Sequence, residues 1–68
     1  MNSSKDRARL RRIEALLEKH PEGLRGSEIA RKLELHRSTV MRDLPALEEM
    51  GVFLTEDDSG RIGLFRRR

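Results

Sequence analysis

Apolar residues recur at a helical spacing in the first part of the chain. Leu10, Ile13 and Leu17 fall at i, i+3 and i+7, and charged residues occupy the other side of the predicted helix. Pro21 follows, and proline cannot extend a helix because it lacks a backbone N–H and clashes with the preceding turn. The pattern therefore predicts a helix over residues 5–20.

Two more helical segments follow. The second is expected over about residues 27–34 and is only about two turns long, so it needs to pack against the rest of the fold to be stable. The third is expected over about residues 37–50, where Val40, Leu44 and Leu47 lie at i, i+4 and i+7. A short connection separates the two segments.

Towards the C-terminus the hydrophobic period changes from helical to alternating. Val52 and Leu54 share one face of an extended segment, and residues 61–65 form a second alternating run. The polar residues 56–60 between the runs include a glycine, as is typical of a hairpin turn. We expect a β-hairpin over residues 52–65, and hence a mostly α fold with a small β-hairpin, of the α+β class.

The second and third helices have the features of a helix-turn-helix motif. Ala30 is small enough for a close helix crossing, Leu35 supplies an apolar residue in the turn, and Val40 is an inward anchor near the start of the third helix. The outward-facing side chains around Val40 are Arg37, Ser38, Thr39, Met41 and Arg42. These residue types bond guanine, phosphate and base edges or contact a thymine methyl, which favours a helix in the DNA major groove. The alternative is a solvated, charged face of a small helical domain.

Charge is unevenly distributed along the chain. There are 15 Lys and Arg against 12 Asp and Glu, for a net charge of +3. Residues 1–43 have a balance of +4, residues 44–60 hold five acids and no base, and residues 61–68 hold four arginines and no acid. Such segregation is typical of a protein with one face for a polyanion and another turned away from it.

The composition excludes several classes of function. A chain of 68 residues makes one small domain, and without cysteine it has neither a disulfide framework nor a thiolate zinc site. His20 and His36 lie far apart, so no metal or other cofactor is expected, and no nucleophile–base pair indicates an enzyme. No apolar run is long enough for a membrane span. We therefore expect a cytoplasmic binding module with no membrane partner.

Residues 29–52 resemble the winged helix-turn-helix DNA-binding domains of bacterial regulators. The likeness is greatest to the DeoR type and to the N-terminal domain of WYL-domain regulators. The shared pattern reads Arg37-x-Thr39-Val40-x-Arg42-Asp43-Leu44, followed by Ala46-Leu47-Glu48 and Gly51-Val52. The resemblance extends over roughly residues 5–65, with the hairpin as the wing. The polar residues 1–4 are expected to form a flexible N-terminus, and residues 66–68 a basic tail.

This resemblance implies sequence-specific binding of double-stranded DNA by a transcriptional regulator of the repressor type. In those families the third helix enters the major groove, which assigns groove contacts to the five side chains around Val40. The resemblance also implies a homodimer, with two half-sites spaced by a helical turn of DNA. A C-terminal effector-sensing domain absent from this chain is implied as well, so that the chain is an excised DNA-binding domain; a free-standing small regulator is the alternative.

A second set of candidates lies outside that helix face. The residues expected to contact the DNA backbone, directly or from the wing, are His36, Arg61, Arg66 and Arg67. Contacts of this kind are salt-sensitive and independent of base sequence. A solvated chain end is the alternative for the tail. The three acids at residues 56–58 would repel phosphate, so a wing that braces the fold without entering DNA is an equal alternative.

Three residues depart from the family pattern. Glu34 stands where a glycine with left-handed torsions is usual, so either it adopts that strained conformation or the turn is shaped differently. His36 stands where a Ser or Thr cap is usual, which predicts a poorer N-cap for the third helix. Pro45 removes the helical hydrogen bond to the carbonyl of Met41, which predicts a kink there or a new start at Pro45.

The four arginines of the first helix leave alternatives open. Arg7, Arg9, Arg11 and Arg12 spread around the helix instead of forming one stripe. Most are expected in solvent, and one or two could reach a phosphate.

The competing function is a winged-helix module for protein–protein contact. Phe53 and Phe65 would form an exposed patch for a partner if both lie on the outer face of the hairpin. The position of the positive charge separates the two functions. Convergence of Arg37, Arg42 and Arg61 on one face favours DNA, whereas acids over that face favour the protein interface.

Overall fold

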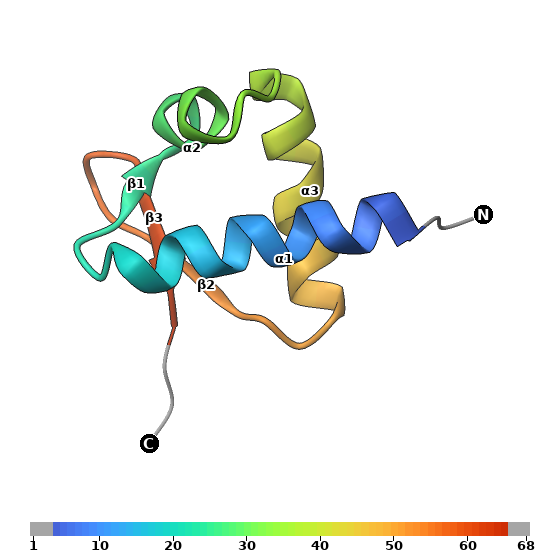
Figure 1. The fold of residues 1–68 in the computed structure, drawn as a ribbon. Coiled ribbons are helices and arrows are strands. Elements are labelled where there is room, and N and C mark those ends of the chain that lie inside the picture. Colours follow the sequence, from blue (N-terminus) through green and yellow to red (C-terminus); the bar gives the residue numbers. More distant parts are fainter. Residues whose placement is uncertain (1–3, 66–68) are drawn as a thin grey trace.

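The chain folds into three helices and a small three-stranded antiparallel sheet (Figure 1). The computed structural model describes residues 4–65. In chain order the elements are α1 (Ser4–Lys19), β1 (Leu24–Arg25), α2 (Gly26–Leu33), α3 (Arg37–Glu49), β2 (Leu54–Glu56) and β3 (Arg61–Leu64). This arrangement confirms the predicted α+β winged helix-turn-helix fold.

The described part of the chain begins with helix α1. Ser4, which the sequence analysis placed in the polar start, is the first residue of α1. Residues 1–3 lie outside the described part, as does the basic tail 66–68 with the candidates Arg66 and Arg67.

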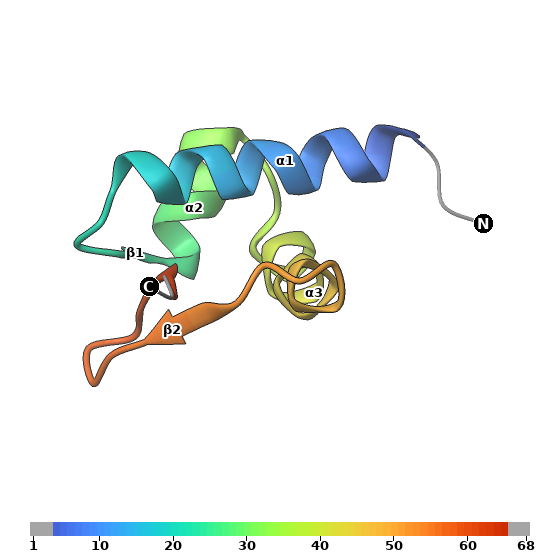
Figure 2. The ribbon, with the colours of Figure 1, turned by 90° about the horizontal axis from the view of Figure 1, so that it is seen from below.

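The core lies where the helices meet the sheet. α1 crosses over α3, which is seen end-on in Figure 2, and the strands lie on the side away from the N-terminus of α1. The buried apolar residues are Leu10, Ile13, Leu17, Leu24, Ile29, Ala30, Val40, Leu44, Leu47 and Ile62. The apolar stripes predicted for the first and third helices are therefore the faces that the fold buries.

The sheet has one more strand than the predicted hairpin. Its order is β1-β3-β2, and Leu24 of β1 lies opposite Ile62 of β3. The chain reaches β1 through Gly23, which has φ of +93° and approaches β3 closely. A Cβ atom at Gly23 would lie 3.1 Å from the Cβ of Arg61, so this approach requires glycine.

The turn between α2 and α3 resolves one of the open alternatives. Glu34 adopts the left-handed conformation that glycine usually supplies, with φ of 58° and ψ of 46°. For a residue with a Cβ this conformation costs about 1–2 kcal/mol. The conformation lets the N–H of Leu35 donate to the carbonyl of Ala30 at 2.8 Å, which satisfies an end carbonyl of α2. Leu35 itself packs against the core.

α3 combines a weak start with a proline in its interior. No side-chain hydrogen bond caps the helix at His36, as the sequence predicted, and its carbonyl accepts from the N–H groups of Thr39 and Val40. The helix continues through Pro45 without a break, so there is no new helical start there. Pro45 is exposed, which places the lost hydrogen bond on the solvent side, where water can replace it.

Candidate nucleic-acid interface

The two faces of α3 differ sharply in their surroundings. Val40, Asp43, Leu44 and Leu47 are buried against the rest of the fold. On the opposite face Arg37, Ser38, Met41 and Arg42 are exposed, and Thr39 is half-buried. All five predicted groove-facing residues therefore lie on the accessible side of α3, in the half of the helix that precedes Pro45.

A hollow of about 410 Å³ lies between α3 and the wing. We call it the wing-side hollow; it is lined by Arg37 and Met41 of α3, Arg25 at the end of β1, and residues of the wing turn. A Cβ atom built on Gly26 would lie 3.2 Å from the sulfur of Met41. The missing side chain at Gly26 thus makes room for Met41 over the first turn of α2.

A second hollow, of about 670 Å³, lies on the other flank of α3. We call it the α1-side hollow, because the N-terminal half of α1 forms one wall and Thr39 and Arg42 of α3 form part of the other. Arg7 and Arg11 line the α1 wall. The predicted groove-facing residues thus divide between two flanks, with an exposed ridge of α3 between them.

A bidentate ion pair joins α1 to α3. Arg9 Nε donates to Asp43 Oδ2 at 2.5 Å, and Arg9 Nη2 donates to Asp43 Oδ1 at 3.0 Å. Asp43 is only 4% exposed, so its charge needs this partner. The pair fixes α3 against α1 beside the outward-facing Arg42.

This ion pair was not predicted from the sequence. One signal was available, because Asp43 interrupts the stripe of Val40, Leu44 and Leu47 at a position that faces the core. A carboxylate in such a stripe requires a buried cation. The pattern alone does not show which arginine of α1 supplies it.

The wing turn is shaped by one of its acids. Asp57 Oδ1 accepts three hydrogen bonds, from Ser59 N at 3.0 Å, Ser59 Oγ at 2.8 Å and Arg61 N at 2.9 Å. The backbone hydrogen bond from Arg61, followed by the bond from the Ser59 side chain, holds the pKa of Asp57 below its ordinary value of 3.8. Asp57 therefore has a structural role in the turn.

The candidates outside α3 occupy different places. His36 is exposed immediately before α3. Arg61 lies beside Pro21, Glu22 and Gly23 on a shallow hollow of about 130 Å³. The structure therefore does not bring Arg61 into the hollows that Arg37 and Arg42 line.

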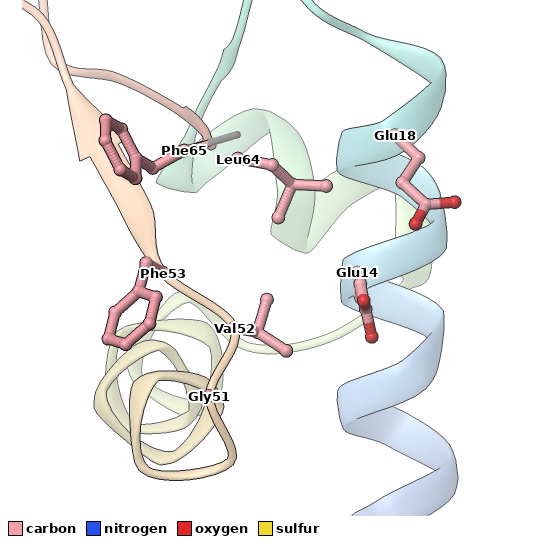
Figure 3. A pocket seen from close by; sticks show the side chains of 7 residues that line it. All are labelled: Glu14, Glu18, Gly51, Val52, Phe53, Leu64 and Phe65. Atoms are coloured by element: carbon pink, nitrogen blue, oxygen red, sulfur yellow. The ribbon is translucent and has the colours of Figure 1, made fainter. Parts of the chain in front are cut away.

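An exposed aromatic pair lies at the open end of the β2–β3 hairpin, opposite the wing turn. The N–H of Phe65 donates to the carbonyl of Phe53 at 2.8 Å, and the two side chains are 52% and 51% exposed. Figure 3 shows both rings on the same side of the strands, while Val52 and Leu64 point towards α1. These four side chains line a pocket of about 390 Å³, and Glu14 and Glu18 of α1 line it as well.

The described residues contain neither a cluster of metal-ligating side chains nor a helix suited to cross a membrane. Within residues 4–65, no group of three His, Cys, Asp or Glu side chains is placed to hold a metal ion. No helix in this part of the chain is long and apolar enough to cross a membrane.

The fold and the exposed, basic half of α3 define a protein of the winged helix-turn-helix class. A family model described as an HTH domain matches residues 9–60, and the chain belongs to this helix-turn-helix domain family. The match supports the predicted class of DNA-binding domains, which are not enzymes as a rule. No curated protein and no solved structure matches the chain.

Proposed function

We propose that the chain binds duplex DNA as the DNA-binding domain of a transcriptional regulator, with α3 in the major groove. The observation that carries the proposal is the contrast between the two faces of α3. One face is fixed by the core and by the Arg9–Asp43 ion pair, and the other presents polar and basic side chains to solvent. A rigid helix with such a face is what direct readout of base edges requires.

The five outward residues have distinct expected roles. Arg42, on the exposed ridge and the α1-side flank, is the candidate for a bidentate contact to guanine. Met41 is 50% exposed and suits contact with a thymine methyl. Ser38 and Thr39 suit phosphates or base edges, and Arg37 reaches towards the wing-side hollow.

Contacts with the DNA backbone complete the proposed interface. His36 is exposed at the N-terminal end of α3, where the helix dipole also favours an anion. Arg61, Arg66 and Arg67 are proposed contacts of the wing and the tail. The hydrogen bonds that Asp57 accepts within the turn support a wing that braces the fold. Such a wing would contact the DNA backbone through the side chain of Arg61.

The regulatory part of the proposal rests on the resemblance to DeoR-type and WYL-domain regulators. It comprises a repressor role, a homodimer and an effector-sensing domain. Two copies related by a twofold axis would place their α3 helices in successive major grooves, about 34–36 Å apart.

The test uses a duplex selected by the protein from a pool of randomised sequences. We expect the logarithm of its binding constant to fall linearly with the logarithm of the salt concentration. Arg42→Ala should weaken binding by about 1–3 kcal/mol if Arg42 pairs with a base. Lys19→Ala, which removes the same charge from the far end of α1, is the matched control. Absence of binding at low salt, or equal effects of the two variants, would contradict the proposal.

The aromatic pair supports a second function, protein contact through the outer face of the sheet. Phe53 and Phe65 expose their rings on one side of the strands, an apolar patch that suits a partner with apolar side chains. The double variant Phe53→Ser, Phe65→Ser distinguishes the functions. DNA binding through α3 should be retained in this variant, whereas association with a protein partner through the sheet face should be lost.

A further inference from the structure

We infer that Arg7 and Arg11 of α1 form a second phosphate-binding site, which holds the DNA backbone beside the groove that α3 enters. This inference rests on the proposed function and extends it to a helix for which the sequence left the question open. It follows from the different surroundings of the four arginines of α1.

Two of these arginines are engaged within the protein. Arg9 forms the bidentate pair with Asp43, and Arg12 Nη2 donates to the carbonyl of Leu33 at 3.4 Å. Their side chains serve to hold α1 against α2 and α3. The bidentate pair therefore keeps Arg9 from a ligand, and Arg12, whose bond is at an exposed position, does not line the α1-side hollow.

The other two arginines face the α1-side hollow. Arg7 and Arg11 are exposed and line it together with Arg42 and Thr39 of α3. In the described part of the chain no hydrogen bond or ion pair engages either guanidinium group. Their spacing of i and i+4 puts them on one side of α1, about 6 Å apart along the helix axis.

The charge of the hollow favours an anion. Among the residues whose side chains the structure describes, its acidic lining residues are Asp43 and Glu49. Arg9 compensates Asp43, which leaves Glu49 to oppose the three arginines at positions 7, 11 and 42. A hollow with this surplus of positive charge attracts phosphate oxygens, and the guanidinium groups can bind them bidentately.

Because the α1-side hollow lies next to the exposed side of α3, its ligand would be the DNA duplex that α3 contacts. Thr39 and Arg42 belong both to this hollow and to the exposed side of α3. The N-terminal turns of α1 extend past α3, as Figure 2 shows. DNA that contacts Arg42 therefore brings its backbone towards Arg7 and Arg11, and these residues would contact phosphates without reading the sequence.

The experiment measures the salt dependence of binding to the selected duplex for three proteins. These are the wild type, the variant Arg7→Ala, Arg11→Ala, and the control Lys19→Ala, Lys32→Ala. The control also removes two exposed positive charges from helices, from positions outside the hollow. Thermal unfolding of each protein shows that the variants remain folded.

We expect the slope of log K against log salt to become shallower by about two in the arginine variant, because each phosphate contact contributes about 0.9. Binding at about 0.1 M salt should weaken by up to roughly tenfold for each lost contact, with the base preference unchanged. The variant Arg7→Lys, Arg11→Lys should recover most of the slope. The lysine control should keep the wild-type slope.

The outcomes separate this inference from the proposed function. If the arginine variant behaves like the lysine control while Arg42→Ala weakens binding, the α1 site is wrong and the role of α3 stands. If the arginine variant alters the base preference, Arg7 and Arg11 are not simple phosphate contacts. Failure of the wild type to bind any duplex overturns both proposals.

Discussion

The helical part of the molecule and its sheet are stabilised in different ways. The largest fully buried side chains, each below 2% exposure, all belong to helices: Ile13, Leu17, Ile29, Val40 and Leu47. In the strands the buried apolar side chains are Leu24 and Ile62. The sheet relies in addition on local devices, namely the close approach at Gly23 and the hydrogen bonds of Asp57.

The position of α3 and the shape of the wing therefore depend on different interactions. The core and the Arg9–Asp43 pair hold α3 as part of the helical unit. The wing depends on short-range geometry that a single substitution can alter. Changes in the helical part should therefore affect the whole fold, and changes in the wing should have smaller and more local effects.

The largest effect is expected for Asp43→Ala. It removes a buried carboxylate and leaves Arg9, whose side chain is 28% exposed, without its partner in this ion pair. Because Arg9 is partly solvated, we expect the free energy of unfolding to fall by about 2–3 kcal/mol, less than for a fully buried pair. Urea unfolding of both single variants and of the double variant Arg9→Ala, Asp43→Ala gives the coupling between them. Additive effects would show that the pair contributes no interaction energy of its own.

A smaller effect is expected for Gly23→Ala at the entry to the sheet. The substitution combines an unfavourable φ with a Cβ that meets Arg61 at 3.1 Å, so we expect a loss of about 1–2 kcal/mol. Gly51→Ala is the matched control, because Gly51 also has a positive φ but no atom within 4 Å of the added Cβ. Thermal unfolding should show the larger loss at Gly23. Equal losses would mean that backbone torsion alone matters and that the contact with β3 is unimportant.

The smallest effect is expected from acid on the wing turn. The folded state holds the pKa of Asp57 below 3.8, so its ionised form stabilises the fold above the unfolded pKa. This contribution should be lost as the pH falls through the lowered folded pKa, below about pH 4. Chemical shifts of the Ser59 and Arg61 amides report the change. Asp57→Asn keeps an acceptor oxygen but cannot titrate there, and persistence of the transition in that variant would assign it to another group.

The sequence alone was sufficient to predict those parts of the fold whose pattern of apolar residues repeats along one helix or strand. Helical spacing of leucine, isoleucine and valine gave the buried faces of α1 and α3, and alternation gave the hairpin. The exposed side of α3 followed from the same period, because residues that do not face the core must face solvent. The accessibility of Arg37, Met41 and Arg42 was predictable for this reason, whereas their DNA contacts stay a prediction.

The features that were missed depend on contacts between distant parts of the chain. β1 has two residues and exists as a strand only because β3 pairs with it, so it carries no period of its own. The Arg9–Asp43 pair joins residues 34 positions apart. Its arginine could not be distinguished from Arg7, Arg11 and Arg12 without the rotation of α1 and its crossing over α3.

The most direct test of the central claim maps the DNA interface on the protein. Backbone amide shifts of the labelled chain are followed during titration with the selected duplex. We predict that the largest changes cluster at residues 37–42 of α3, with further changes at residues 7–11 of α1. The outer sheet face at Phe53 and Phe65 should change little. Changes centred on that face, or no changes at low salt, would contradict the account.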